Sequence, residues 1–211
     1  VLVIRNPLEN LDTTPARPGL VGVVAVLFGS TAFDSFKESS RWLGWSQQYS
    51  EHSTAINGLA LLGFCLTVLV TFVLASQATL VLGHVHRANL PNLMAHSVVP
   101  IVVGYVFAHY LTYFLSTGVQ TLQQLGDPLN RGWDLGAPAE QLDQYWIYGF
   151  PTAIAVTKVI AVVTGHVLGV ISAHDRAVRL LPPDHAIRGQ LPMLILMVGY
   201  TVTGLWLLFS S

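Results

Sequence analysis

Charged residues are scarce in this sequence, and cysteine is almost absent. Lys, Arg, Asp and Glu together make up 10% of the 211 residues, whereas soluble domains typically contain about 25%. The 10 basic and 11 acidic residues leave a net charge of -1, which excludes the basic face that nucleic acid would require. A single cysteine, Cys65, excludes a disulfide or a cysteine-based metal site within the chain, and we expect an inert buried thiol.

Apolar residues make up 52% of the sequence and fall into long segments. A membrane-spanning helix needs roughly 20 mostly apolar residues, and lipid offers the backbone no partner outside its own helix. We therefore predict an all-α, polytopic transmembrane bundle of about five spanning helices. Its expected partners are the lipid bilayer and further helices of the same or another chain. The predicted helices are 19–36, which is the shortest, 56–83, 92–117, 147–174 and 190–209.

The basic residues gather on one side of the membrane if these segments alternate in direction. One side receives Arg5, Arg17, Arg87, Arg176, Arg179 and Arg188, and the other receives only Lys37, Arg41 and Arg131. The positive-inside rule places the arginine-rich side in the cytoplasm. We therefore expect the amino end to be cytoplasmic and the carboxyl end to lie outside.

This topology divides the chain into an amino-terminal segment, 1–18, and a transmembrane domain, 19–211. The chain starts at Val1 without an initiating Met or an apolar signal, so we expect the first segment to continue from an upstream part. An external loop, 118–146, is longer than most connections between helices. Such a loop is either a lid or binding element or a solvated connector.

One group of ionisable side chains inside the apolar segments lies toward the outer side of the membrane; we call it the outer group. With a rise of 1.5 Å per residue, His109 lies roughly 6 Å, Lys158 roughly 3 Å and Asp34 roughly 10 Å outside the segment middles. Such groups are costly in hydrocarbon and usually face a cavity or a partner. We expect an ion pair between Asp34 and Lys158, and we place Tyr105 on the His109 side of its helix. Lys158, His109, Asp34 and Tyr105 are the candidate transport path.

A second, inner group of histidines lies toward the cytoplasmic side, and it is the candidate metal or haem site. Its members are His96, His166, His174 and Asp175, with His84 and His86 at the rim. A transition metal is one candidate cofactor, and a single haem b between His96 and His166 is another. Two stacked haems are disfavoured, because the interval from His96 to His109 turns a helix by about 220°.

One face of the fourth segment carries both glycines and ionisable residues. Lys158, Gly165, His166, Gly169 and Ala173 fall within roughly an 80° arc. The Gly165–x–x–x–Gly169 spacing is typical of close helix contacts in membranes, so this face is expected to meet protein rather than lipid. Whether the glycines only pack helices or also frame a polar site stays open at this point.

The polar groups favour a transporter or an ion- or proton-translocating component, because His, Asp and Lys can form a titratable path. No HExxH, GxSxG, P-loop or CxxC motif points to an enzyme. Two other classes stay open. One is a haem-b or quinone-interacting redox subunit, and the other is a non-catalytic subunit of a larger membrane complex.

Four strings, VIRNPLENLD, LFGSTAFDSF, AHSVVPIVVGYVFAHY and GHVLGVISAHDRAV, resemble uncharacterised polytopic membrane proteins of actinobacteria. The resemblance covers most of the chain, as the carboxyl-terminal part of longer proteins. It implies a multi-pass location in the plasma membrane and an upstream part with further helices. It implies no catalytic residue and no known chemistry.

Overall fold

The computed structural model describes residues 15, 17–79, 86–129, 131–133, 143, 145–180 and 186–210. These residues form helices and connections, with no strand among them. Five helices are long and apolar enough to cross a membrane, which confirms the predicted all-α bundle. They are α2 (Leu20–Lys37), α4 (Ser53–Ala78), α5 (Leu90–Gln124), α7 (Pro151–Leu180) and α8 (Ala186–Ser210).

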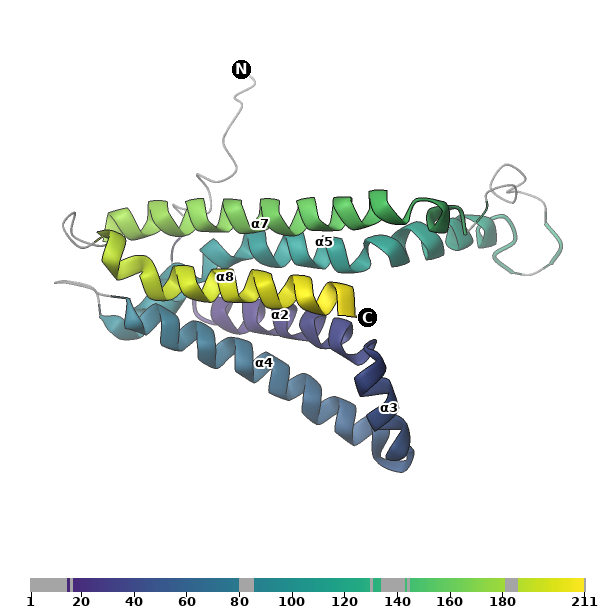
Figure 1. The fold of residues 1–211 in the computed structure, drawn as a ribbon, viewed down its shortest axis with the longest axis horizontal. Coiled ribbons are helices and arrows are strands. Elements are labelled where there is room, and N and C mark those ends of the chain that lie inside the picture. The colour runs from purple at the N-terminus through teal and green to yellow at the C-terminus, as the bar shows by residue number, and fades with distance from the viewer. Residues whose placement is uncertain are drawn as a thin grey trace, which may run out of the picture.

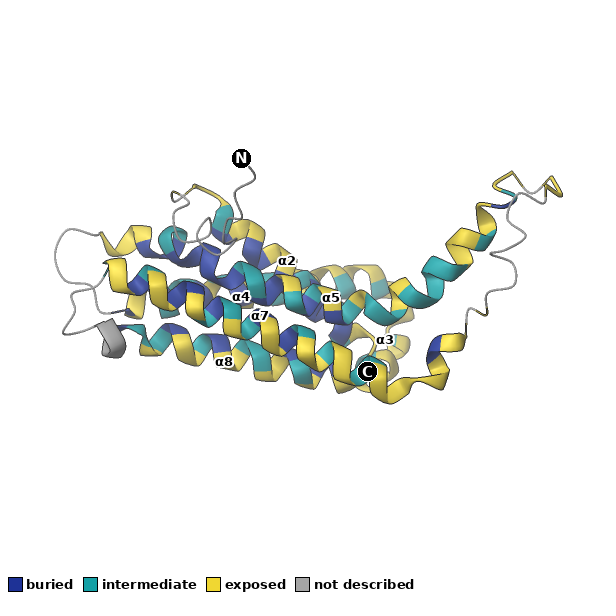
Figure 2. Ribbon diagram, turned by 90° about the horizontal axis from the view of Figure 1, so that it is seen from above, coloured by how far each residue is buried: buried dark blue, intermediate teal, exposed yellow. Residues whose placement is uncertain are grey.

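Successive long helices run in opposite directions, and α5 lies at the centre of the bundle (Figure 1). Helices α5 and α7 run side by side, α2 and α8 pack against the same core, and α4 leans away from the bundle toward α3. Buried residues concentrate where these helices meet, and the far end of α5 carries only intermediate and exposed residues (Figure 2). The core joins Phe28, Phe72, Met94, Ile101 and Tyr105, each no more than 4% exposed.

Several predicted helix boundaries are wrong: α4 ends at Ala78 rather than at 83, and α7 spans Pro151–Leu180 rather than 147–174. Helix α5 continues to Gln124, so the connection predicted at 118–146 begins later than expected. The connection between the predicted helices 19–36 and 56–83 contains a helix, α3 (Ser40–Gln48), whose N-cap Ser39 accepts a hydrogen bond from Trp42 N at 3.4 Å. Hydropathy marks the part of a helix that suits lipid, whereas caps and polar residues extend helices beyond it. Short 3-10 turns lie at Ser50–His52, Arg87–Asn89 and Trp146–Gly149.

The predicted glycine face of α7 forms its contact with α5. A Cβ on Gly165 would lie 2.5 Å from the carbonyl oxygen of Pro100, and one on Gly104 would lie 2.6 Å from the carbonyl oxygen of Ala161. A Cβ on Gly169 would lie 2.9 Å from the carbonyl oxygen of Ser97. The two backbones therefore touch, which only glycine permits.

A second close approach joins α2 to α4. A Cβ on Gly29 would lie 2.6 Å from the Cα of Cys65. The Cys65 thiol is half-buried rather than fully buried as expected, and it lies 4.0 Å from the carbonyl oxygen of Val26. Further along, rings of α2, α3 and α4 pack together; for example, Phe36 contacts Trp42 at 5.3 Å and Phe64 at 5.3 Å between centroids.

Candidate functional site

Ser35 connects α2 to two side chains of α5. Its Oγ lies 2.8 Å from the Tyr105 hydroxyl and 2.9 Å from His109 Nδ1. Tyr105 and His109 are four residues apart, so they share one face of α5 and both can reach the same hydroxyl. Ser35 and Tyr105 are each 1% exposed. These three residues, the Ser35 relay, form a continuous hydrogen-bonded chain inside the bundle.

Asp34, the neighbour of Ser35, finds different partners from the one predicted. Lys37 Nζ donates to Asp34 Oδ1 at 2.7 Å, and the Tyr110 hydroxyl donates to Asp34 Oδ2 at 2.7 Å. The predicted ion pair between Asp34 and Lys158 is therefore wrong. Lys37 lies three residues along the same helix and reaches the carboxylate without any tertiary contact.

Lys158 lies apart from the Ser35 relay, in a separate hollow. It lines a cavity of about 220 Å³ with Thr112, Tyr148 and Phe209 among its neighbours. Within the described part of the chain, its ammonium group makes no hydrogen bond or ion pair. The outer group predicted from depth thus divides into a hydrogen-bonded part around Ser35 and an isolated lysine.

Tyr105 also lines a cavity of about 270 Å³ between α2, α4, α5 and α8. The same cavity is lined by a second pair of hydroxyls, Thr71 and Tyr200, which are 2.7 Å apart. The Tyr200 hydroxyl also lies 3.0 Å from the carbonyl oxygen of Val68. Phe28 separates the two tyrosine rings, with centroids 5.5 Å from Tyr105 and 4.9 Å from Tyr200. The cavity therefore has two sets of hydroxyl groups in a mainly apolar lining.

His166 faces α8 rather than another histidine. Its Nδ1 lies 2.8 Å from Thr201 Oγ1, and this hydroxyl donates to the carbonyl oxygen of Met197 at 3.0 Å. His166 therefore bridges α7 and α8.

His96 is buried in α5, 8% exposed, and its Nδ1 has no hydrogen-bond partner among the described residues. A haem between His96 and His166 does not fit this packing. The backbones of α5 and α7 touch at Gly165 and Pro100, so there is no room for a macrocycle between the two helices.

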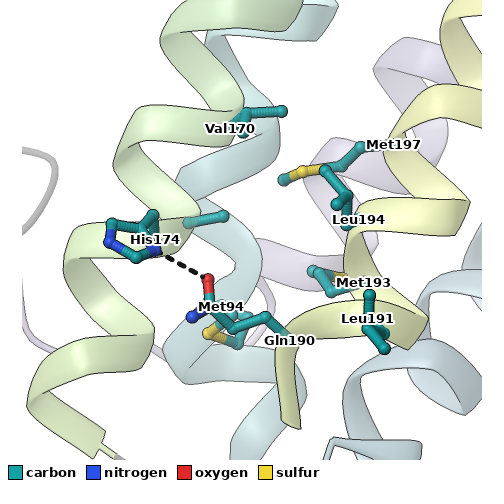
Figure 3. A pocket seen from close by; sticks show the side chains of 9 residues that line it. Met94, Val170, His174, Gln190, Leu191, Met193, Leu194 and Met197 are labelled. Atoms are coloured by element: carbon teal, nitrogen blue, oxygen red, sulfur yellow. Dashed lines mark hydrogen bonds between the residues drawn. The ribbon is translucent and has the colours of Figure 1, made fainter. Parts of the chain in front are cut away.

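The predicted inner histidines do not gather into one cluster. No set of three or more His, Cys, Asp or Glu side chains that could hold a metal ion occurs among the described residues. Asp175 and His86 are exposed, and His84 lies outside the described residues. His174 instead bonds through Nδ1 to Gln190 Oε1 at 3.1 Å, at the edge of a further cavity (Figure 3).

Neither Ser35 nor the residues around His174 could be recognised as site residues from the sequence. Ser35 is a small hydroxyl among many in apolar segments, and only the meeting of α2 and α5 distinguishes it. Comparison with protein-family models, with curated proteins and with solved structures found no match.

Proposed function

We propose that this chain is a proton- or ion-translocating component of a membrane protein and that the Ser35 relay is part of the path. The observation that carries the proposal is the unbroken contact from Tyr105 through Ser35 to His109. Polar side chains buried between transmembrane helices commonly mark ion pathways and proton relays.

The chemistry of the three groups suits proton transfer. Each hydroxyl both donates and accepts, so the chain can be oriented in either direction. Imidazole can accept a proton on one ring nitrogen and release one from the other, so His109 can carry a proton between its neighbours. A cavity lies beside Tyr105 at one end of the relay. The hydrogen-bonded pair of Asp34 and Tyr110 lies near His109 at the other end.

Lys158, predicted for the path, and His166, predicted for the metal or haem site, have secondary parts in this proposal. Lys158 lines a separate cavity and makes no hydrogen bond to the relay, and His166 belongs to the α7–α8 contact. We therefore expect His109 and Ser35 to matter more for proton flux than Lys158 or His166.

Reconstitution in liposomes with an internal pH-sensitive dye tests the proposal. A potassium diffusion potential drives proton entry, and the initial rate is measured for the parent chain, Ser35→Ala and His109→Gln. Both variants should lose most of the flux, because each breaks the relay at one residue. Ser30→Ala is the matched control, since Ser30 lies on the same helix and bonds only to its own backbone, at Leu27 O.

Equal flux in Ser35→Ala and the parent would overturn the proposal. The same bonds would then serve only to hold α2 against α5, the role expected in a non-catalytic subunit. A redox subunit has less support, because the α5–α7 contact leaves no space for a haem. A haem α-band in the optical spectrum of the purified, reduced protein would instead support the redox subunit.

We also propose the plasma membrane as the location, with the arginine-rich end of the bundle in the cytoplasm. Arg176 and Arg179 lie at that end of α7, whereas Glu38 and Glu51 lie at the opposite end of the bundle. Single cysteines introduced at Ser50 and Arg179, in a chain with Cys65→Ala, test the orientation. An impermeant maleimide added to cells should label only the first.

A further inference from the structure

The three methionines of this sequence all line one cavity. Met94 comes from α5, and Met193 and Met197 come from successive turns of α8. Each is no more than 2% exposed, so none of the three thioethers faces lipid. The cavity measures about 220 Å³ and lies toward the end of the bundle where α7 ends and α8 begins.

One imidazole completes the wall of this cavity. His174 lines the cavity from α7, and its Nδ1 is directed toward Gln190 at the edge (Figure 3). His174 is exposed, so it lies where a ligand could enter. The remaining lining residues are aliphatic, and no carboxylate is among the described residues that line the cavity.

This ligand set suits a soft cation. Thioether sulfur is a soft donor that selects Cu(I), and imidazole is a common additional ligand for copper. Hard cations such as Mg²⁺ and Ca²⁺ require oxygen ligands, usually carboxylates, which the cavity does not offer. A monovalent ion is also less costly than a divalent one in a site without a counter-charge.

We propose that this cavity binds a single Cu(I) ion through Met94, Met193, Met197 and His174. The inference does not rest on the proton relay, because the site uses none of its residues. Methionine has three rotatable bonds, so the three sulfurs can converge on one ion within the cavity. His174 binds through Nδ1 once its proton moves to Nε2, and the Gln190 amide then releases the ring.

The competing explanation is that methionine only fills an irregular part of the core, its most common role. Exchange of Met for Leu separates the two, because it preserves volume and is among the best tolerated core substitutions. A packing role predicts no change in metal binding. A ligand role predicts a large one.

The test is Cu(I) binding to the purified full chain in detergent, under reducing conditions, in competition with a chromophoric Cu(I) chelator. The parent should bind one Cu(I) per chain and no Zn(II). Met193→Leu and Met197→Leu combined should weaken Cu(I) binding by more than roughly 10–100-fold. That range is the cost of losing a group that only hydrogen-bonds to a metal ligand. His174→Gln should weaken it as well.

Two controls keep the result interpretable. Ser35→Ala should bind Cu(I) like the parent even if it loses proton flux, so the two proposals can fail separately. X-ray absorption at the copper edge of the loaded parent should show sulfur neighbours, whether or not the variants fold. No Cu(I) binding by the parent, unchanged affinity in the double variant, or a spectrum with only nitrogen and oxygen neighbours would overturn the proposal.

Discussion

The two contacts that α5 makes with its neighbours are built in opposite ways. Against α7, glycines bring the backbones together until no side chain fits between them. Against α2, Ser35 meets Tyr105 and His109 through hydrogen bonds, with a cavity alongside. Where the glycines meet, no space is left between the two helices, whereas the α2 contact leaves room for polar groups and a cavity. The Ser35 relay accordingly lies on the α2 side of the central helix.

The largest effect should come from filling the glycine contact. Gly165→Leu would place its Cβ 2.5 Å from the carbonyl oxygen of Pro100, so α7 must move away from α5. We expect a loss of about 3 kcal/mol or more in the free energy of unfolding, above the usual cost of an overpacked core. Unfolding by denaturing detergent, followed by circular dichroism, measures it.

Gly199→Leu is the matched control for this variant. Gly199 is an exposed helical glycine on α8, and a Cβ there meets nothing within 4 Å. Its stability should stay close to that of the parent. Equal losses in both variants would mean that the α5–α7 contact does not depend on glycine.

A smaller effect should come from breaking the polar contact. Tyr105→Phe keeps the ring that packs on Phe28 but removes the hydroxyl that bonds to Ser35. We expect a loss of about 0.5–1.5 kcal/mol in the free energy of unfolding, the range for one buried interhelical hydrogen bond. The same unfolding assay measures it.

Tyr113→Phe gives the comparison for Tyr105→Phe on the same helix. The Tyr113 side chain is 64% exposed, so the loss of its hydroxyl should change stability little. If Tyr105→Phe is as stable as Tyr113→Phe, the Ser35 relay contributes nothing to the α2–α5 contact, and only its proton transfer would remain to be tested.

The smallest effect should come from the ion pair at the end of α2. Asp34→Asn removes the charge that pairs with Lys37, and the two side chains are 28% and 47% exposed. Exposed pairs contribute about 0–1 kcal/mol, so we expect a change within that range, measured by the same unfolding assay. A loss as large as that of Gly165→Leu would show that Asp34 has a buried role that its exposure does not indicate.

Several features followed from sequence because they depend on local pattern. Five long apolar runs predicted five helices, because the length and hydropathy of each run alone decide whether it can cross a membrane as a helix. The Gly165–x–x–x–Gly169 spacing predicted a close contact, because two small residues one turn apart leave a groove on any helix. Helix ends were less predictable; α3 and the end of α5 lie beyond the apolar runs that hydropathy detects.

The partners of the polar groups could not be predicted in the same way. Depth along each helix placed Asp34 and Lys158 in one group, but depth does not say which faces meet. The structure pairs Asp34 with Lys37 and Tyr110 instead, and leaves Lys158 in a separate cavity.

Sequence by itself thus determined the class of this protein, its number of long helices and one of its interfaces, because these depend on the free energy of local segments in lipid. Only the tertiary structure decided that Ser35 joins Tyr105 to His109, and that three methionines from two helices share a cavity with His174. These groupings depend on the rotation and register of helices that are far apart in the chain. Rotation and register are set by packing of the whole bundle.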